Sequence, residues 1–121
     1  MKSLLRIVLT LIIVAAIWTV RGAGTSPSTV KLAWDPSSST NSGPITYNIY
    51  WGVATRTYTN SGSAGTNLTF TVTNLARGST YYFAATAVDT NSLESDYSNE
   101  ASWSALLPPA IPSTFRIITA N

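Results

Sequence analysis

The sequence predicts an all-β protein, folded as an antiparallel β-sandwich of two sheets. Three observations support this prediction. From Thr25 onward several windows alternate strictly between apolar and polar residues, and none carries apolar residues at helical spacing. Clusters of Gly, Pro, Ser and Asn separate the alternating runs. Five clear runs and one weaker run follow one another within roughly 80 residues, which suits two packed sheets better than a single sheet.

A leader-like segment, residues 1–24, precedes these runs. Lys2 and Arg6 come first, an apolar run over residues 7–20 follows, and Arg21 is followed by small residues, which is the order of a secretory signal. As a helix the run would span roughly 21 Å, less than the ~30 Å hydrocarbon core, which favours a cleaved signal peptide. The alternative is an uncleaved anchor helix over residues 4–20, which Arg21 near the cleavage position favours. Both alternatives predict export to the periplasm, cell surface or medium, with membrane contact only through this segment.

The domain is predicted to cover residues 25–105, with strands at 30–34, 47–51, 68–73, 80–89 and 97–103 and a weaker one at 56–60. In each run, apolar side chains two residues apart are expected to face the core. The small residues 61–65 are predicted to form a flexible turn, and the last run is expected to place Tyr97 and Trp103 inward. The remaining inner faces are predicted to be Val30, Leu32 and Trp34; Tyr47, Ile49 and Trp51; Leu68, Phe70 and Val72; and Tyr81, Phe83, Ala85 and Ala87.

Residues 106–121 are predicted to form a Pro-rich linker and a strand-like tail. Pro109 has no N–H to donate, so strand pairing is expected to stop there. Further along, Phe115 and Ile117 lie on one face of an alternating run. These two residues are therefore candidates for donating a strand to a neighbouring subunit.

Several stretches resemble the fibronectin type III family, over about residues 29–103. The spacing of Leu75, Gly78 and Tyr81 resembles the family's tyrosine corner, in which the tyrosine hydroxyl bonds backward to the main chain. Residues 93–100 are similar to the version of this domain found in secreted bacterial and bacteriophage proteins. The other stretches are Val30-Lys31-Leu32-Ala33-Trp34-Asp35-Pro36, Ile45-Thr46-Tyr47-Asn48-Ile49-Tyr50-Trp51 and Thr80-Tyr81-Tyr82-Phe83-Ala84-Ala85-Thr86-Ala87-Val88-Asp89.

The resemblance implies an immunoglobulin-like sandwich with strands B, C, C′, E, F and G and a role as a spacer or adhesion module, without chemistry of its own. It implies structural roles for Trp34, Tyr47, Leu75, Gly78, Tyr81 and Phe83. One departure concerns the family's first strand, A. Residues 25–29 are too short and too polar for it, so the edge of strand B is expected to be uncovered.

Composition excludes most enzyme classes. The chain has neither Cys nor His, which removes a Ser-His or Cys-His pair, a thiolate nucleophile and a Cys/His zinc site. Beyond the leader, four scattered basic residues face five acidic ones, which argues against a nucleic-acid partner. No catalytic residue, metal site or cofactor is therefore predicted.

Two groups of residues are candidate sites. Asp89, Glu94, Asp96 and Glu100 could offer oxygen ligands to calcium, but their spacing matches no ordered calcium loop, so a solvated acidic loop is the preferred interpretation. Tyr50 and Tyr82 are expected to lie near each other on the exposed face of neighbouring strands. Such a pair either stacks on a sugar ring or a partner's apolar patch, or only stabilises the sheet.

Three hypotheses of function follow. The leading one is an exported, non-catalytic module for attachment or display at a bacterial or virion surface. The second is a structural subunit whose tail donates a strand to a neighbour, giving head-to-tail self-association. The third is a carbohydrate-binding accessory, resting on Tyr50 and Tyr82. The expected partners are a protein or a surface polysaccharide.

Overall fold

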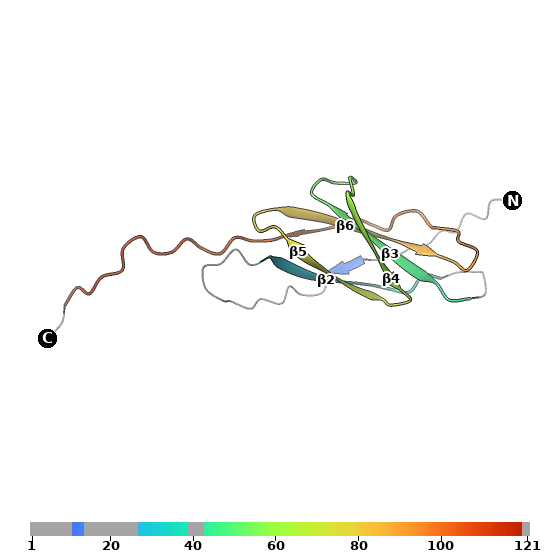
Figure 1. Cartoon of the computed structure of the whole chain (residues 1–121), viewed down its shortest axis with the longest axis horizontal. Helices are drawn as coiled ribbons and strands as arrows, with labels where there is room; N and C mark the ends of the chain where they lie inside the picture. Colours follow the sequence, from blue (N-terminus) through green and yellow to red (C-terminus); the bar gives the residue numbers. More distant parts are fainter. Residues whose placement is uncertain (1–10, 14–26, 39–42, 120–121) are drawn as a thin grey trace.

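The computed structural model describes residues 11–13, 27–38 and 43–119, and these form two antiparallel sheets packed face to face (Figure 1). One sheet has the strand order β1-β2-β5 and the other β4-β3-β6-β7. The predicted all-β sandwich is confirmed. The strands are β1 (Leu11–Ile13), β2 (Ser28–Trp34), β3 (Thr46–Gly52), β4 (Asn60–Gly65), β5 (Thr69–Leu75), β6 (Thr80–Val88) and β7 (Ala101–Ser104).

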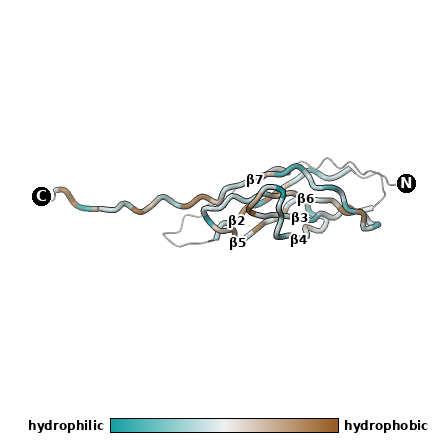
Figure 2. Tube along the Cα trace, turned by 90° about the horizontal axis from the view of Figure 1, so that it is seen from above, coloured by the Kyte–Doolittle hydropathy of each residue, from teal (hydrophilic) through white to brown (hydrophobic). Residues whose placement is uncertain are grey.

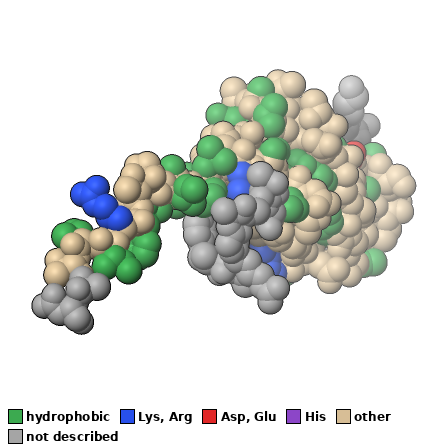
Figure 3. Space-filling model, turned by 60° about the vertical axis from the view of Figure 1, so that its left-hand side comes forward, with side chains coloured by type: hydrophobic (Ala, Val, Ile, Leu, Met, Phe, Trp, Pro, Cys, Tyr) green, Lys and Arg blue, Asp and Glu red, His purple; other side chains and the backbone are tan. Residues whose placement is uncertain are grey.

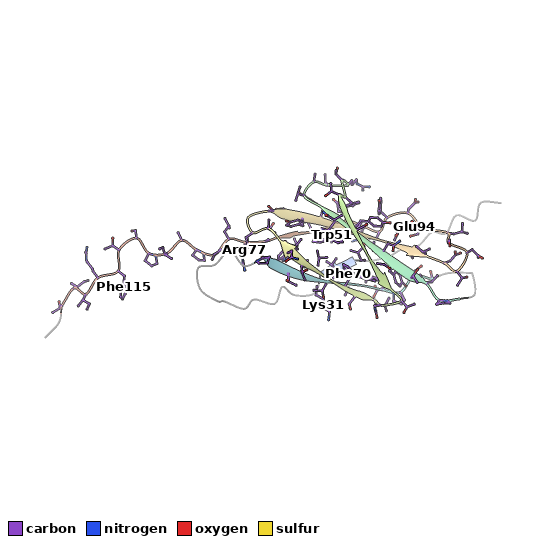
Figure 4. The ribbon with its side chains drawn as sticks, viewed as in Figure 1. Lys31, Trp51, Phe70, Arg77, Glu94 and Phe115 are labelled. Atoms are coloured by element: carbon purple, nitrogen blue, oxygen red, sulfur yellow. The ribbon has the colours of Figure 1, made fainter. Side chains whose placement is uncertain are left out.

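The core lies between the sheets and follows the predicted alternation, because every second side chain of a strand faces the same side. Trp51 of β3 and Phe70 of β5 approach each other across this space, with ring centroids 6.2 Å apart (Figure 4). Leu68 is an exception to the prediction, since it lies before β5 and is 38% exposed. The buried hydrophobic cluster contains Val30, Leu32, Trp34, Tyr47, Ile49, Ala64, Val72, Leu75, Tyr81, Phe83, Ala85 and Ala87.

The tyrosine corner joins the start of β6 to the chain before it. The Tyr81 hydroxyl accepts a hydrogen bond of 2.8 Å from the backbone N–H of Ala76. Gly78 adopts a φ of 82°, a conformation that favours glycine, and this turns the chain into β6. The buried Leu75 anchors the other side of the turn. The predicted backward bond of Tyr81 is therefore present, and its partner is a donor.

For residues 56–65 the structure differs from the prediction of a weak strand followed by a turn, because β4 spans Asn60–Gly65. The flexible turn predicted at 61–65 is instead an edge strand paired with β3, while Ala54 and Thr57 form an isolated bridge. Within this strand, Gly62 leaves room for the ring of Phe70. A Cβ atom on Gly62 would lie 2.7 Å from Cζ of the Phe70 ring. The low β-propensity of small residues disfavours such a strand, but packing and pairing with β3 outweigh this preference.

Strand β1 lies within the segment predicted to be a leader helix. Its residues pair antiparallel with Leu32, Ala33 and Trp34 of β2. The prediction of an uncovered β2 edge is therefore wrong for these three residues. A short apolar run can form a strand as well as a helix, and here it forms a strand. The rest of residues 1–24 lies outside the described residues, as do Thr25 and Ser26, and export remains a prediction. Among the described residues, no helix is long and apolar enough to span a membrane.

The C-terminal tail leaves β7 as an extended segment without a strand among its described residues (Figure 1). Apolar stretches recur along it, and its hydrophobic side chains are open to solvent (Figures 2 and 3). Phe115 lies far from the sandwich and is 96% exposed, and Ile117 is 80% exposed (Figure 4). None of the described residues buries the two predicted strand-donor residues.

Candidate functional site

Three tyrosines pack together on the exposed face of the sheet β4-β3-β6-β7. The Tyr97 ring stands at a steep angle to both others, with its centroid 5.1 Å from that of Tyr50 and 5.0 Å from that of Tyr58. The centroids of Tyr50 and Tyr58 are 6.5 Å apart. We call these three residues the tyrosine cluster. Edge-to-face contacts of this kind hold the rings in defined relative positions.

Residues 94–100, between β6 and β7, bring Tyr97 to this face. The backbone N–H groups of Ser95 and Ser98 donate to the carbonyl oxygens of Ala87 and Ala85, at 2.8 Å each. The two serine hydroxyls in turn accept from the N–H groups of the same alanines, at 2.9 Å each. Each serine thus satisfies both backbone groups of one β6 residue. This attachment fixes the segment along the edge of β6.

The segment repeats every three residues, whereas a β-strand repeats every two. With Ser95 and Ser98 against β6, Glu94, Tyr97 and Glu100 come to lie on the side of the tyrosine cluster. The predicted inward position of Tyr97 is therefore wrong, since the residue is 54% exposed. Trp103, which belongs to β7, packs against the core as predicted.

Glu94 is held by three donors at one carboxylate oxygen. Its Oε1 accepts hydrogen bonds from the hydroxyls of Thr86 and Tyr50, at 2.5 and 2.8 Å, and from Nδ2 of Asn48 at 3.3 Å. The bonds from Thr86 and Tyr50 lower the pKa of Glu94 below its ordinary value of 4.5, against the opposing effect of partial burial. Partial burial, and then the bond to Glu94, raise the pKa of Tyr50. Glu94 is therefore a carboxylate at neutral pH.

Glu100 fixes the other end of the cluster. It accepts hydrogen bonds from the hydroxyls of Thr55 and Tyr58 and from the backbone N–H of Arg56. Partial burial opposes the charge of Glu100, but these three bonds together outweigh it, so the pKa falls below 4.5. The pKa of Tyr58 is raised, first by partial burial and then by its bond to Glu100. The hydroxyls of Tyr50 and Tyr58 are thus each held by a carboxylate.

A pocket of about 320 Å³ opens beside the cluster. Tyr50 and Tyr97 form part of its wall, and two acidic residues, Glu94 and Asp96, also line it. This combination of aromatic surface and acceptor oxygens can bind a small polar or cationic group. The lining residues are Tyr50, Thr86, Glu94, Ser95, Asp96 and Tyr97.

The predicted pair, Tyr50 and Tyr82, shares one face of the sheet without meeting ring to ring. Tyr50 lies opposite Ala84 across the β3–β6 ladder, and Tyr82 lies opposite Gly52. Within the described part of the chain, the ring contacts of Tyr50 are with the other members of the tyrosine cluster. That Tyr50 and Tyr82 bind a ligand together remains a prediction.

The solvated acidic loop that the sequence predicts is present in part, since Glu94 and Asp96 are exposed, Glu100 is half-buried and Asp89 is buried. Asp89 is buried, and its Oδ1 accepts hydrogen bonds from the backbone N–H groups of Asn91 and Leu93, at 2.8 and 2.9 Å, which closes the turn after β6. Glu94 and Glu100 bind the tyrosine cluster instead. Over residues 11–13, 27–38 and 43–119, no three His, Cys, Asp or Glu side chains lie close enough to hold a metal ion.

Sequence reasoning missed Tyr58, Tyr97 and the role of the two glutamates. The sequence signal was that Glu94, Tyr97 and Glu100 are three residues apart. Ser95 and Ser98 follow one position later with the same spacing. A search for alternation of period two passes over this pattern.

Comparisons with known proteins agree with this fold. The family model of the fibronectin type III domain matches residues 15–104, and so begins inside the segment predicted as a leader. A solution structure of a fibronectin type III domain derived from human KIAA0970 protein aligns with a TM-score of 0.61 and 20% identity, covering 98% of this chain and 86% of that one. The third fibronectin III domain of human KIAA0343 protein aligns with a TM-score of 0.50 and 14% identity, covering 83% and 99%. No curated protein sequence matches the chain.

Proposed function

The chain belongs to the fibronectin type III family, and from this premise we propose that it is an exported, non-catalytic module for attachment or display at a bacterial or virion surface. Domains of this family generally act as binding or structural modules. The lack of His and Cys and the basic-then-apolar N-terminus support the proposal. So does the likeness of residues 93–100 to the version of the domain in secreted bacterial and bacteriophage proteins.

The observation that carries the binding role is the pocket beside the tyrosine cluster. Its walls are held in place before any ligand arrives, because two hydroxyls are bonded to carboxylates and Tyr97 contacts both other rings. A pre-formed site loses less conformational entropy when a ligand binds. Tyr97 is exposed above the half-buried Tyr50 and Tyr58, and aromatic side chains that reach the surface in this way are typical of recognition surfaces.

Antibody labelling of intact bacteria that express the full chain with an epitope after Asn121 tests the proposal. We expect labelled cells that keep the label after washing, and a chain lacking residues 1–24 should stay inside the cell. Label confined to broken cells would contradict export. A chain found entirely in the medium would contradict attachment.

A second candidate function, self-assembly through the tail, is favoured by the exposure of Phe115 and Ile117. If export removes residues 1–24, β1 is removed with them, and the edge of β2 along Leu32, Ala33 and Trp34 is freed. Residues 113–118 of a neighbouring molecule would then supply the missing strand. Such a head-to-tail contact extends into a filament unless it closes.

Light scattering on residues 25–121, with and without residues 109–121, checks this candidate. We expect the longer chain to form oligomers whose mass rises with concentration, because the apolar tail alternation meets an open strand edge. The shorter chain should remain a monomer. Monomers in both samples at high concentration would exclude strand donation.

A further inference from the structure

The pocket beside the tyrosine cluster carries negative charge on two side chains. Glu94 uses one oxygen, Oε1, for its three hydrogen bonds, and none of the described residues donates to its Oε2. Asp96 lines the same pocket, and the hydrogen bond at this residue from the Ser95 hydroxyl goes to its backbone oxygen. The pocket therefore presents carboxylate oxygens that are available to a ligand.

The described part of the chain supplies no cation to this pocket. Arg56 acts on Glu100, which lies outside the pocket lining. Lys31 projects from the exposed face of β2, in the other sheet. Arg77 bonds the carbonyl of Leu106 at the end where the tail begins, away from Glu94 (Figure 4). A cationic ligand would therefore meet acidic side chains here that no described Lys or Arg approaches.

The walls and the size of the pocket restrict the range of possible ligands further. The rings of Tyr50 and Tyr97 line it, and tyrosine faces attract cations, guanidinium groups above all. Its volume of about 320 Å³ lies at the lower end of the range for ligand pockets, which suits one side chain better than an oligosaccharide. We infer that this pocket binds an arginine side chain of a partner protein, an inference that rests on the proposed attachment function.

Arginine fits better than lysine or a sugar for geometric reasons. A guanidinium group is planar, so it stacks on a tyrosine ring while its N–H groups donate in a fork to carboxylate oxygens. At the residues that line the pocket, the carboxylate oxygens to which no described residue donates are Oε2 of Glu94 and those of Asp96. The hydroxyls of a neutral sugar can donate hydrogen bonds to the same oxygens, but a sugar leaves their negative charge uncompensated.

The test is an NMR titration of the full chain with two capped pentapeptides, Gly-Gly-Arg-Gly-Gly and the same peptide with citrulline, the neutral isostere of arginine. We expect the arginine peptide to shift the amide signals of Glu94, Ser95 and Tyr97. The citrulline peptide is expected to bind at least about tenfold more weakly, because charge-assisted hydrogen bonds are lost. A lysine peptide should lie between the two.

Two variants form a matched pair, since both replace a glutamate that is held by three donors on the same sheet face. Glu94→Gln should weaken arginine binding about tenfold, whereas Glu100→Gln, whose carboxylate holds Tyr58 outside the pocket lining, should weaken it far less. Asp96→Asn should weaken binding as well. It also keeps the test decisive if Glu94→Gln does not fold, because no described residue donates to the Asp96 side chain.

Equal binding of the two peptides, or equal loss in Glu94→Gln and Glu100→Gln, would overturn the inference. Shifts of the same signals by glucose but not by the arginine peptide would make this a sugar site instead. A chain that reaches the cell surface without binding arginine leaves the attachment proposal intact. Arginine binding by a chain that stays inside the cell overturns export alone.

Discussion

Trp34→Ala is expected to lower the free energy of unfolding by about 3 to 5 kcal/mol. The side chain is only 4% exposed, and its ring centroid lies 5.6 Å from that of Tyr47, between the two sheets. Truncation removes a large buried apolar surface and leaves a cavity that the paired strands cannot close. A domain of this kind has a total stability of about 5 to 15 kcal/mol, so the variant should be marginal at room temperature.

Denaturant melts of the full chain measure this loss, and Trp34→Phe is the control. The Trp34 indole N–H is buried without a hydrogen-bond partner among the described residues. Phenylalanine removes that unpaired donor while keeping an aromatic ring, so its effect should be much smaller. A loss below about 1 kcal/mol in Trp34→Ala would contradict the central packing role of this residue.

Tyr81→Phe is expected to cost about 1 to 3 kcal/mol, because it leaves the N–H of Ala76 without its acceptor. Tyr81 itself is 9% exposed, so water reaches the vacated position poorly. Tyr82→Phe, one residue along, should cost almost nothing, since no described residue bonds its hydroxyl. Chemical denaturation of both variants compares them directly. Equal losses at the two positions would show that the corner bond does not stabilise the fold.

The sandwich was predictable because burial alternates along most strands. Val30, Leu32 and Trp34, like Tyr47 and Ile49, are each two residues apart, and a period of two reports which face of a strand meets the core. The corner was predictable for another reason. A local hydrogen bond from a turn to the following strand leaves a fixed sequence spacing, which no long-range contact has to supply.

Strand β4 was not predictable, because the size of one of its residues depends on a side chain in the opposite sheet. Gly62 is small since the ring of Phe70, on β5, occupies the space next to it. A reading of local propensity takes the same glycine as a sign of flexibility. Packing between elements carries this information, and the sequence alone does not reveal which elements meet.

The tyrosine cluster was only partly predictable for a related reason. Tyr50 follows from the outward position in its strand, but Tyr97 depends on a segment with a period of three. The glutamates were visible as acidic residues, and their donors come from strands and loops more than 40 residues earlier as well as from nearby Thr86. Distant pairings of this kind are set by the sheet topology.

The paired serines have a consequence for solubility. Strand β7 covers β6 only at Thr80 to Phe83, which leaves the later half of this long, apolar strand without a neighbouring strand on the edge away from β3. Strands of this type recruit other chains and seed cross-β aggregates when their amide and carbonyl groups are free. Ser95 and Ser98 occupy those groups on Ala87 and Ala85 with a backbone donor and a hydroxyl acceptor each. An irregular stretch of chain thus protects the protein from aggregation where a regular strand would itself have exposed a further edge.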